Sequence, residues 1–340
     1  MTVDFDKPTL VTGASGMVGN NLVRHLLGLG RTVRVFVRQK DNRSLNGLNV
    51  ETFVGDVLCA KDLAAAMKGV SSVFHLAGAV AIDGQHDEGM MQVNVNGTAN
   101  VVAACLAHGV DRMIHFSSIH AMSHLPRNEP IDEQRELAFD PATHLAYDQS
   151  KAGGEREVMA GIDSGLDAVI LNPVGIVGPN DFGPSPAGEF LLQLIHRRLP
   201  GLVAAGYYWV DVRDVASAAV SAESNGTCGE KYILYSQHVT FKSIAQWVEE
   251  ITGVRPPLFI LPIWMARIFA PVITGYSRLR GIRPLVTPEA IQIVCCHQKI
   301  STEKAAVELG FQARQIQETV VDTVRWLKSD ELIKNSSDVT

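Results

Sequence analysis

Residues 9–19 read TLVTGASGMVG, and this short stretch decides the fold of the chain. Its first four residues are short, apolar and β-prone, and they run directly into Gly13. From Met17 onward the apolar residues recur at helical spacing as far as Leu27. The stretch therefore predicts a strand, a tight turn and a helix. In that order the turn holds free backbone N–H groups and the positive end of the helix dipole.

The glycines of this turn have separate tasks. Gly13 permits the turn, Gly16 permits close approach of the backbone to a ligand, and Gly19 lets the helix lie near the strand. Their spacing is GxxGxxG, which differs from the GxGxxG of the standard dinucleotide fingerprint. An ordinary strand–helix turn is the alternative interpretation. We predict that a dinucleotide pyrophosphate binds at Gly13, Ser15, Gly16, Met17 and Val18.

The second predicted strand ends at residues that can select the cofactor. It covers residues 32–37 and is followed by Arg38, Lys40 and Arg43. A guanidinium group binds phosphate with two hydrogen bonds, whereas an Asp or Glu at this place would bind the ribose 2′-hydroxyl of NAD. We therefore expect NADP(H), with Arg38 on its 2′-phosphate. Asp41 is the competing feature, because it could accept a ribose hydroxyl if the loop folds differently.

Two later strand ends also carry polar residues. Residues 50–57 are predicted to form a third strand with Asp56 and Val57 at its carboxyl end, where ligands bind in open α/β sheets. Asp56 could reach the adenine amino group from there. A further apolar run, MIHF, ends at Ser117 and Ser118, whose hydroxyls could hydrogen-bond a substrate carbonyl. Alternation along a strand points these two side chains to opposite faces. We favour Ser118, and Ser117 is the competing assignment.

Tyr147 and Lys151 lie four residues apart in a segment of helical character, so they share one face of the helix. A free phenol has a pKa of about 10, and a nearby ammonium lowers that pKa by favouring the phenolate. Tyr147 then becomes a usable proton donor for carbonyl reduction, or an acceptor for alcohol oxidation. Without the glycine-rich turn this pair would be an ordinary surface Tyr and Lys. His120 and His124 are possible pocket residues, although a histidine in a polar loop is more often solvated.

Together these motifs resemble the extended short-chain dehydrogenase/reductase family over nearly the whole chain. The TGxxGxxG of the family corresponds to residues 12–19, its active-site serine to Ser118, and its YxxxK to Tyr147 and Lys151. The stretches HLAG, NPVGIVGP and WVDVRDVA also look like family signatures. The resemblance implies further cofactor contacts at Leu76, Ala77, Gly78, Ser117, Tyr147, Lys151, Pro173 and Val174.

Within the family the likeness is greatest to dihydroflavonol 4-reductase and its bacterial relatives. Arg38 and the ending STEKAAVELGF at residues 301–311 carry this likeness. It implies an NADPH-dependent reductase of a ketone or aldehyde. The hydride would come from NADPH and the proton from Tyr147, while Ser118 orients the carbonyl and Lys151 holds the ribose.

Two other functions remain open from the sequence. A nucleotide-sugar epimerase or dehydratase of the same family could bind a diphosphate through Arg278, Arg280 and Arg283. A non-catalytic NADP-binding protein is the third possibility, although such proteins often lose the Tyr or the Lys. Residues 90–107 and 145–161 match the helix pair through which many family members dimerise, so a homodimer is expected.

Composition narrows the class of partner. The chain has 340 residues, 46% of them hydrophobic, and a net charge of −6, which gives no reason to expect nucleic-acid binding. Its five cysteines are scattered and lack metal spacing, so we expect no metal, and Cys295 and Cys296 cannot easily bridge each other. Because the first strand begins within about ten residues of Met1, no signal peptide is expected, and a reduced cytoplasm fits best.

Strand–helix alternation from residue 8 to about 171 predicts an α/β protein. It would be a Rossmann-type, doubly wound parallel sheet with a smaller, mostly helical C-terminal substrate lobe. Residues 1–172 and about 207–236 should form the NADP-binding domain, about 173–206 and 237–330 the substrate lobe, and 331–340 a polar tail.

The apolar stretch 258–275 is interrupted by Pro262, Arg267 and Pro271, and a membrane-spanning helix needs about 20 mostly apolar residues. We expect no membrane span here. A buried or lid helix is the favoured interpretation of this stretch, and a membrane-contacting segment is the alternative.

Overall fold

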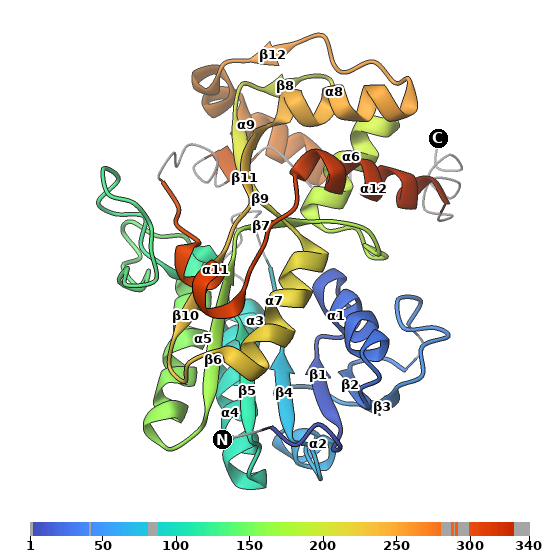
Figure 1. The fold of residues 1–340 in the computed structure, drawn as a ribbon. Helices are drawn as coiled ribbons and strands as arrows, with labels where there is room; N and C mark the ends of the chain where they lie inside the picture. Colours follow the sequence, from blue (N-terminus) through green and yellow to red (C-terminus); the bar gives the residue numbers. More distant parts are fainter. Residues whose placement is uncertain are drawn as a thin grey trace.

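A computed structural model of the chain describes residues 3–40, 42–80, 88–279, 287–288, 290–291 and 299–329. The expected polar tail, Asp41, Cys295, Cys296, Arg280, Arg283 and the side chain of Arg278 lie outside the described residues. Within the described chain a seven-stranded sheet has the order β10-β6-β5-β4-β1-β2-β3, with every neighbouring pair parallel (Figure 1). Its strands are β1 (Thr9–Thr12), β2 (Val33–Val37), β3 (Glu51–Val54), β4 (Ser72–His75), β5 (Arg112–Phe116), β6 (Ala168–Pro173) and β10 (Lys231–Leu234).

Helices cover both faces of this sheet, as a doubly wound fold requires. On one face the core contains Leu22 of α1 and Val215 of α7, and on the other it contains Leu63 of α2, Val101 of α4 and Val158 of α5. Strands buried on both faces read as nearly continuous apolar runs, which explains the composition of β1, β2 and β6. The predicted fold class is therefore confirmed. The helices are α1 (Met17–Gly28), α2 (Ala60–Ala66), α4 (Thr98–His108), α5 (Ala146–Asp163) and α7 (Val212–Asn225).

The second lobe lies above the carboxyl ends of the sheet strands in Figure 1. A three-stranded sheet of order β11-β9-β7 and the short parallel pair β8 and β12 form its strands. Its core includes residues of α6, α8 and α12, with Leu191, Trp209 and Val324 among the buried side chains. The bounds are β7 (Gly175–Val177), α6 (Pro186–Ile195), β8 (Leu202–Val203), β9 (Gly206–Asp211), β11 (Gln237–Thr240), α8 (Phe241–Thr252), β12 (Ile260–Leu261), α9 (Ile263–Leu279) and α12 (Ile316–Ser329).

Two segments differ from the expected division into lobes. β9 was expected to return to the nucleotide-binding domain, but it pairs with β7 and β11, and only α7 and β10 return. Conversely α11 (Glu303–Leu309) was assigned to the substrate lobe, yet it packs against α7 and β10. The reason is burial, because Ala305, Leu309 and Phe311 complete the core on that face of the main sheet.

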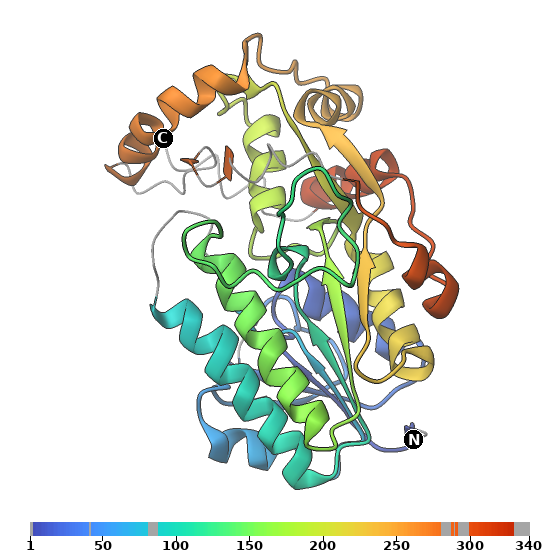
Figure 2. The ribbon, with the colours of Figure 1, turned by 90° about the vertical axis from the view of Figure 1, so that its left-hand side faces the viewer.

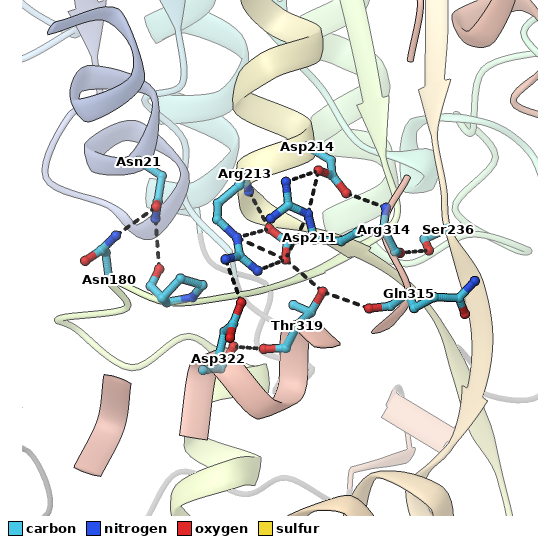
Figure 3. Close-up of polar contacts among 12 residues, drawn as sticks. Asn21, Asn180, Asp211, Arg213, Asp214, Ser236, Arg314, Gln315, Thr319 and Asp322 are labelled. Atoms are coloured by element: carbon cyan, nitrogen blue, oxygen red, sulfur yellow. Dashed lines mark hydrogen bonds and ion pairs between the residues drawn. The ribbon is translucent and has the colours of Figure 1, made fainter. Parts of the chain in front are cut away.

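A polar network joins the two lobes where β9 runs into α7 (Figure 3). The Arg213 guanidinium pairs with Asp211 at 2.6 Å and with Asp322 of α12 at 2.8 Å. Arg314 Nε donates to Asp214 Oδ1 at 2.8 Å. These contacts explain why the stretch WVDVRDVA carries charged residues at the start of a helix, since Arg213 joins α7 to α12 and Asp214 joins it to the chain that precedes α12.

The two helices expected to form a dimer surface pack against each other. Residues 88–108 are helical throughout, as α3 (Glu88–Met91), a π-helical segment η1 (Gln92–Gly97) and α4. Figure 2 shows α4 and α5 side by side on one face of the molecule. The helices themselves agree closely with the expected ranges 90–107 and 145–161, and the homodimer stays a prediction.

Candidate active site

The glycine-rich turn is packed as tightly as the sequence suggested. Gly13 has φ +68°, and a Cβ there would lie 2.6 Å from the backbone nitrogen of Ala77. A Cβ on Gly19 would lie only 2.2 Å from the Gly13 carbonyl oxygen. At Gly16 the nearest protein atom would be 3.4 Å away, which is ordinary contact. Gly13 and Gly19 are therefore needed by the protein itself, whereas the open backbone at Gly16 fits a bound pyrophosphate.

The loop after β2 is attached to this turn. Ser44 Oγ donates to the carbonyl oxygen of Ser15 at 3.0 Å, and Arg24 donates to the Ser44 carbonyl oxygen at 3.1 Å. Arg38 is exposed at the start of the same loop. Asp56 accepts a hydrogen bond from the Leu58 backbone N–H at 2.9 Å. Val57 is buried after β3, which ends at Val54 and is shorter than expected.

A cavity of about 440 Å³ opens beside the turn and between the lobes. It brings together Ser118, Tyr147 and Lys151, the three predicted catalytic residues. Seven of the predicted cofactor contacts also line it, namely Met17, Val18, Leu76, Gly78, Ser117, Pro173 and Val174. Gly13, Ser15, Gly16, Arg38, Asp56, Val57 and Ala77 lie outside the lining, along the turn and the ends of β2, β3 and β4.

The pKa of Tyr147 differs from our expectation. We expected the Lys151 ammonium to lower it, but burial raises it to about 12, against a hydrogen-bonding effect of Ser118 and with a further rise from the Asp148 charge. Tyr147 and Lys151 are partly exposed because they line the cavity. Desolvation by the surrounding protein is nevertheless the largest effect on the pKa of each. Tyr147 is therefore a neutral phenol at neutral pH, which is the form that a proton donor requires.

Two groups act on the Lys151 ammonium, one by a hydrogen bond and one by its charge. Its Nζ donates to the Phe116 carbonyl oxygen at 3.1 Å, at the end of β5. Burial lowers its pKa to about 8, and the Glu155 carboxylate opposes that change. Glu155 is fully buried and pairs with Lys231 Nζ at 2.7 Å, and its other oxygen accepts from Asn172 Nδ2 at 2.5 Å. A negative charge one turn away thus helps Lys151 to remain an ammonium.

The two serines have different surroundings. Ser118 Oγ accepts from the His120 backbone N–H at 3.2 Å, and the Ser118 carbonyl oxygen accepts from Asn172 at 3.0 Å. The Ser117 hydroxyl is buried and has no hydrogen-bond partner within the described chain. Because the Ser118 side chain hydrogen-bonds Tyr147, we keep Ser118 as the predicted catalytic serine. An unpartnered hydroxyl in the cavity wall also fits a cofactor contact at Ser117.

His120 joins the site, whereas His124 does not. His120 Nδ1 lies 3.1 Å from Asp148 Oδ1, its Nε2 lies 2.9 Å from the Tyr207 hydroxyl, and its ring meets Tyr147 edge-on at 5.7 Å. His124 packs against His144 and is absent from the cavity lining. Tyr207 was not predicted. The sequence feature connected with it is Gly175, because a Cβ at this position would lie 2.4 Å from the Tyr207 ring.

The rest of the cavity wall is largely apolar. Sequence reasoning placed the substrate between the lobes but did not identify these side chains, which come from several elements of the second lobe. They include Ile176, Phe190, Leu199, Leu202, Trp209 and Phe241. Among the described residues no three His, Cys, Asp or Glu side chains are grouped so that they could hold a metal ion.

The chain belongs to the NAD dependent epimerase/dehydratase family, whose model matches residues 9–234. It is 35% identical to "Sterol demethylase protein B" of Methylococcus capsulatus over 96% of this chain and 99% of that protein. It is 33% identical to a "Putative dihydroflavonol 4-reductase" of Synechocystis over 95% of each. The crystal structure of gox2253 has a TM-score of 0.80 and 34% identity, covering 94% of this chain and 98% of that one.

This membership defines the general chemistry of the site. Members of the family bind a nicotinamide cofactor and act on alcohols and carbonyls, as oxidoreductases or epimerases. The resemblance to extended short-chain dehydrogenases/reductases is thereby confirmed. In the part of the chain that the structure describes, no helix has the length and apolar character needed to cross a membrane.

Proposed function

We propose that this protein is an NADPH-dependent reductase of a bulky, apolar ketone or aldehyde. The observation that carries the proposal is the convergence of Ser118, Tyr147 and Lys151 on one cavity whose remaining wall is largely apolar. NADPH, when bound, supplies the hydride. The residues of the chain bind the carbonyl, provide the proton and exclude water.

Each residue then has one task. Ser118 hydrogen-bonds the substrate carbonyl oxygen, and its hydrogen bond from the His120 backbone fixes the direction of its lone pairs. Tyr147 donates its phenolic proton to the developing alkoxide. Lys151 stays charged next to the phenol, so the phenolate formed on proton donation is stabilised. Ser117 and the backbone at Pro173 and Val174 hold the reacting end of the cofactor.

Arg38 supports NADPH as the preferred cofactor. It is exposed directly after β2, in the loop that Ser44 fastens to the glycine-rich turn. A guanidinium at this place binds a 2′-phosphate with charge-assisted hydrogen bonds and adds little to the binding of a 2′-hydroxyl. Arg38→Ala should raise the Kd of NADPH about 10- to 100-fold, which is the loss of a charge-assisted hydrogen-bond pair. The Kd of NADH should hardly change.

The apolar wall supports a bulky substrate. Phe190, Leu199, Leu202 and Phe241 offer no hydrogen-bonding groups to a sugar or a nucleotide. The names of the two relatives above, a sterol demethylase protein and a putative dihydroflavonol 4-reductase, refer to ring-containing, largely apolar molecules. We infer a substrate of that general kind, with its carbonyl at Tyr147.

The test is titration with NADPH and NADH, followed by NADPH-oxidation assays on ketosteroids, dihydroflavonols, aliphatic ketones and aldehydes. We expect tight NADPH binding and turnover of at least one apolar carbonyl, which Tyr147→Phe abolishes. NADPH binding without any turnover would favour a non-catalytic binding protein. NAD released from the purified protein on denaturation would favour a nucleotide-sugar epimerase, whose expected arginines lie outside the described residues.

A further inference from the structure

An exposed group of large apolar side chains occupies residues 258–269. Leu258 is 92% exposed, Phe259 70% and Trp264 64%, and Ile260, Ile268 and Phe269 are also exposed. We call these six residues the outer patch. Elsewhere in the described chain, exposed large apolar residues such as Leu29, Val54 and Val307 are far apart in sequence, as is normal on a protein surface. The six residues of the outer patch instead fall within twelve consecutive positions, just before and in β12 and in the first turns of α9.

The fold does not use these side chains. On α9 Ala266, Ala270 and Thr274 are buried, and the two alanines pack with Ile291 and Val203. Trp264 and Ile268 are also four residues apart and therefore share the opposite, outward side of the helix. Figure 1 shows α9 and β12 at the end of the molecule opposite the N-terminus. The inner side of α9 thus satisfies its packing, while a second apolar side faces outward.

The stretch of sequence that contains the outer patch is basic. Residues 251–288 contain five arginines and no Asp, Glu or Lys, although the whole chain has a net charge of −6. Arg255 and Arg267, which the structure describes, are both exposed beside the outer patch. Helices that lie in a membrane interface combine Trp, Phe and Leu on one side with arginine or lysine next to it. Arginines near a bilayer are attracted to anionic headgroups.

We propose that the outer patch docks the protein on the surface of an anionic lipid bilayer. Leu258, Phe259 and Trp264 enter the interfacial layer, and Arg255 and Arg267 contact the headgroups. The inner side of α9 packs on Val203 and Ile291, and both of these line the cavity. A docked α9 therefore separates the lipid from the far end of the cavity by the thickness of one helix, about 10 Å.

The experiment is sedimentation of the full chain with vesicles, which needs neither substrate nor cofactor. Vesicles of phosphatidylcholine alone are compared with vesicles that also contain phosphatidylglycerol, each at low and high salt. The test variant is Leu258→Ser, Phe259→Ser, Trp264→Ser. The matched control is Leu29→Ser, Val54→Ser, Val307→Ser, which removes three exposed apolar side chains elsewhere. A third variant, Arg255→Glu, Arg267→Glu, tests the charge.

We expect the wild-type chain and the matched control to bind the phosphatidylglycerol vesicles, and more weakly at high salt. The test variant should bind about 100-fold less, because three large apolar side chains no longer leave water. The charge variant should bind the phosphatidylglycerol vesicles at least about 10-fold more weakly than the wild type. All substituted positions are exposed, so melting temperatures should remain close to wild type.

Three results would overturn the proposal. The first is a wild-type chain that stays in solution with both kinds of vesicle. The second is equal binding by the test variant and the matched control. The third is light scattering that shows a dimer in the wild type and a monomer in the test variant, without vesicle binding, since the outer patch would then be covered by a second copy. None of these results depends on whether the protein is a reductase.

Discussion

Glu155→Gln is the substitution that tests most directly how the charge of Lys151 is controlled. Glu155 is fully buried one helical turn after Lys151, and it opposes the fall in the pKa of Lys151 to about 8. Two charges at this spacing lie about 6 Å apart and interact by roughly 2–3 kcal/mol at an effective dielectric constant near 20. Lys231, 2.7 Å from Glu155, already neutralises part of that charge. We take about 1.4 kcal/mol as the remainder, which corresponds to about one pH unit.

The sign follows from the form of Lys151 that is needed. Because the proposed mechanism requires the ammonium, kcat/KM should fall as the pH rises through about 8 in the wild-type protein. In Glu155→Gln the same fall should occur about one pH unit lower, with an unchanged plateau on the acid side. The substitution also leaves Lys231 without its carboxylate. Since the Lys231 side chain is 15% exposed, we expect a loss of about 1–3 kcal/mol in unfolding free energy, below the range for a fully buried pair.

The assay is kcat/KM for NADPH between about pH 6 and 9.5, which reports ionisations of the free enzyme. Glu157→Gln is the matched control, because it removes the same charge two positions further along α5 and should leave the profile unchanged. An alkaline limb at the same pH in Glu155→Gln and in the wild type would refute the reasoning. A lower melting temperature without that change would mean that Glu155 only supports the fold.

Three further tests concern the site and the glycine-rich turn. Tyr147→Phe should lower turnover about 10²- to 10⁴-fold without changing the Kd of NADPH, and near-normal turnover would exclude Tyr147 as the proton donor. Gly19→Ala should cost about 2 kcal/mol or more of unfolding free energy, because its Cβ would meet a backbone oxygen at 2.2 Å. Gly28→Ala, in the same helix but in open space, should be neutral or slightly stabilising, and equal melting temperatures would contradict this difference. Tyr207→Phe should raise the KM of the carbonyl substrate about 5- to 10-fold, because the cavity wall loses the hydrogen bond between the Tyr207 hydroxyl and His120. Tyr208→Phe, which packs against Tyr235 instead, should not, and equal KM values in the two variants would remove Tyr207 from substrate binding.

The sequence predicts best what is local. The strand over residues 9–12 follows from adjacent residues, and so do the turn at Gly13 and the placing of Tyr147 and Lys151 on one helix face. Ser118 lines the cavity, because a strand that ends in hydroxyls places them at the edge of a parallel sheet, and its catalytic role stays a prediction. These features need no knowledge of distant contacts.

What the sequence does not predict depends on distant contacts. An apolar strand such as β9 does not specify which sheet it joins, and it pairs with β7 and β11. The pKa of Tyr147 was predicted in the wrong direction because burial depends on atoms from several segments. Tyr207 was missed for the same kind of reason. Its hydroxyl reaches His120 only because Gly175 leaves room for the ring.

The position of α11 limits how chimeras between this protein and a relative can be designed. The chain completes most of the substrate lobe before Leu309 and Phe311 return to the core beside α7 and β10. Glu308 also accepts a hydrogen bond from Tyr232 of β10 at 2.5 Å. A chimera that takes its whole C-terminal half from a relative would therefore import foreign residues into the nucleotide-binding core. The substrate lobe is made of three separate stretches, before α7, between β10 and α11, and after α11. Exchange of substrate specificity therefore needs a junction at each of these boundaries, with residues 303–311 kept from the same parent as α7 and β10.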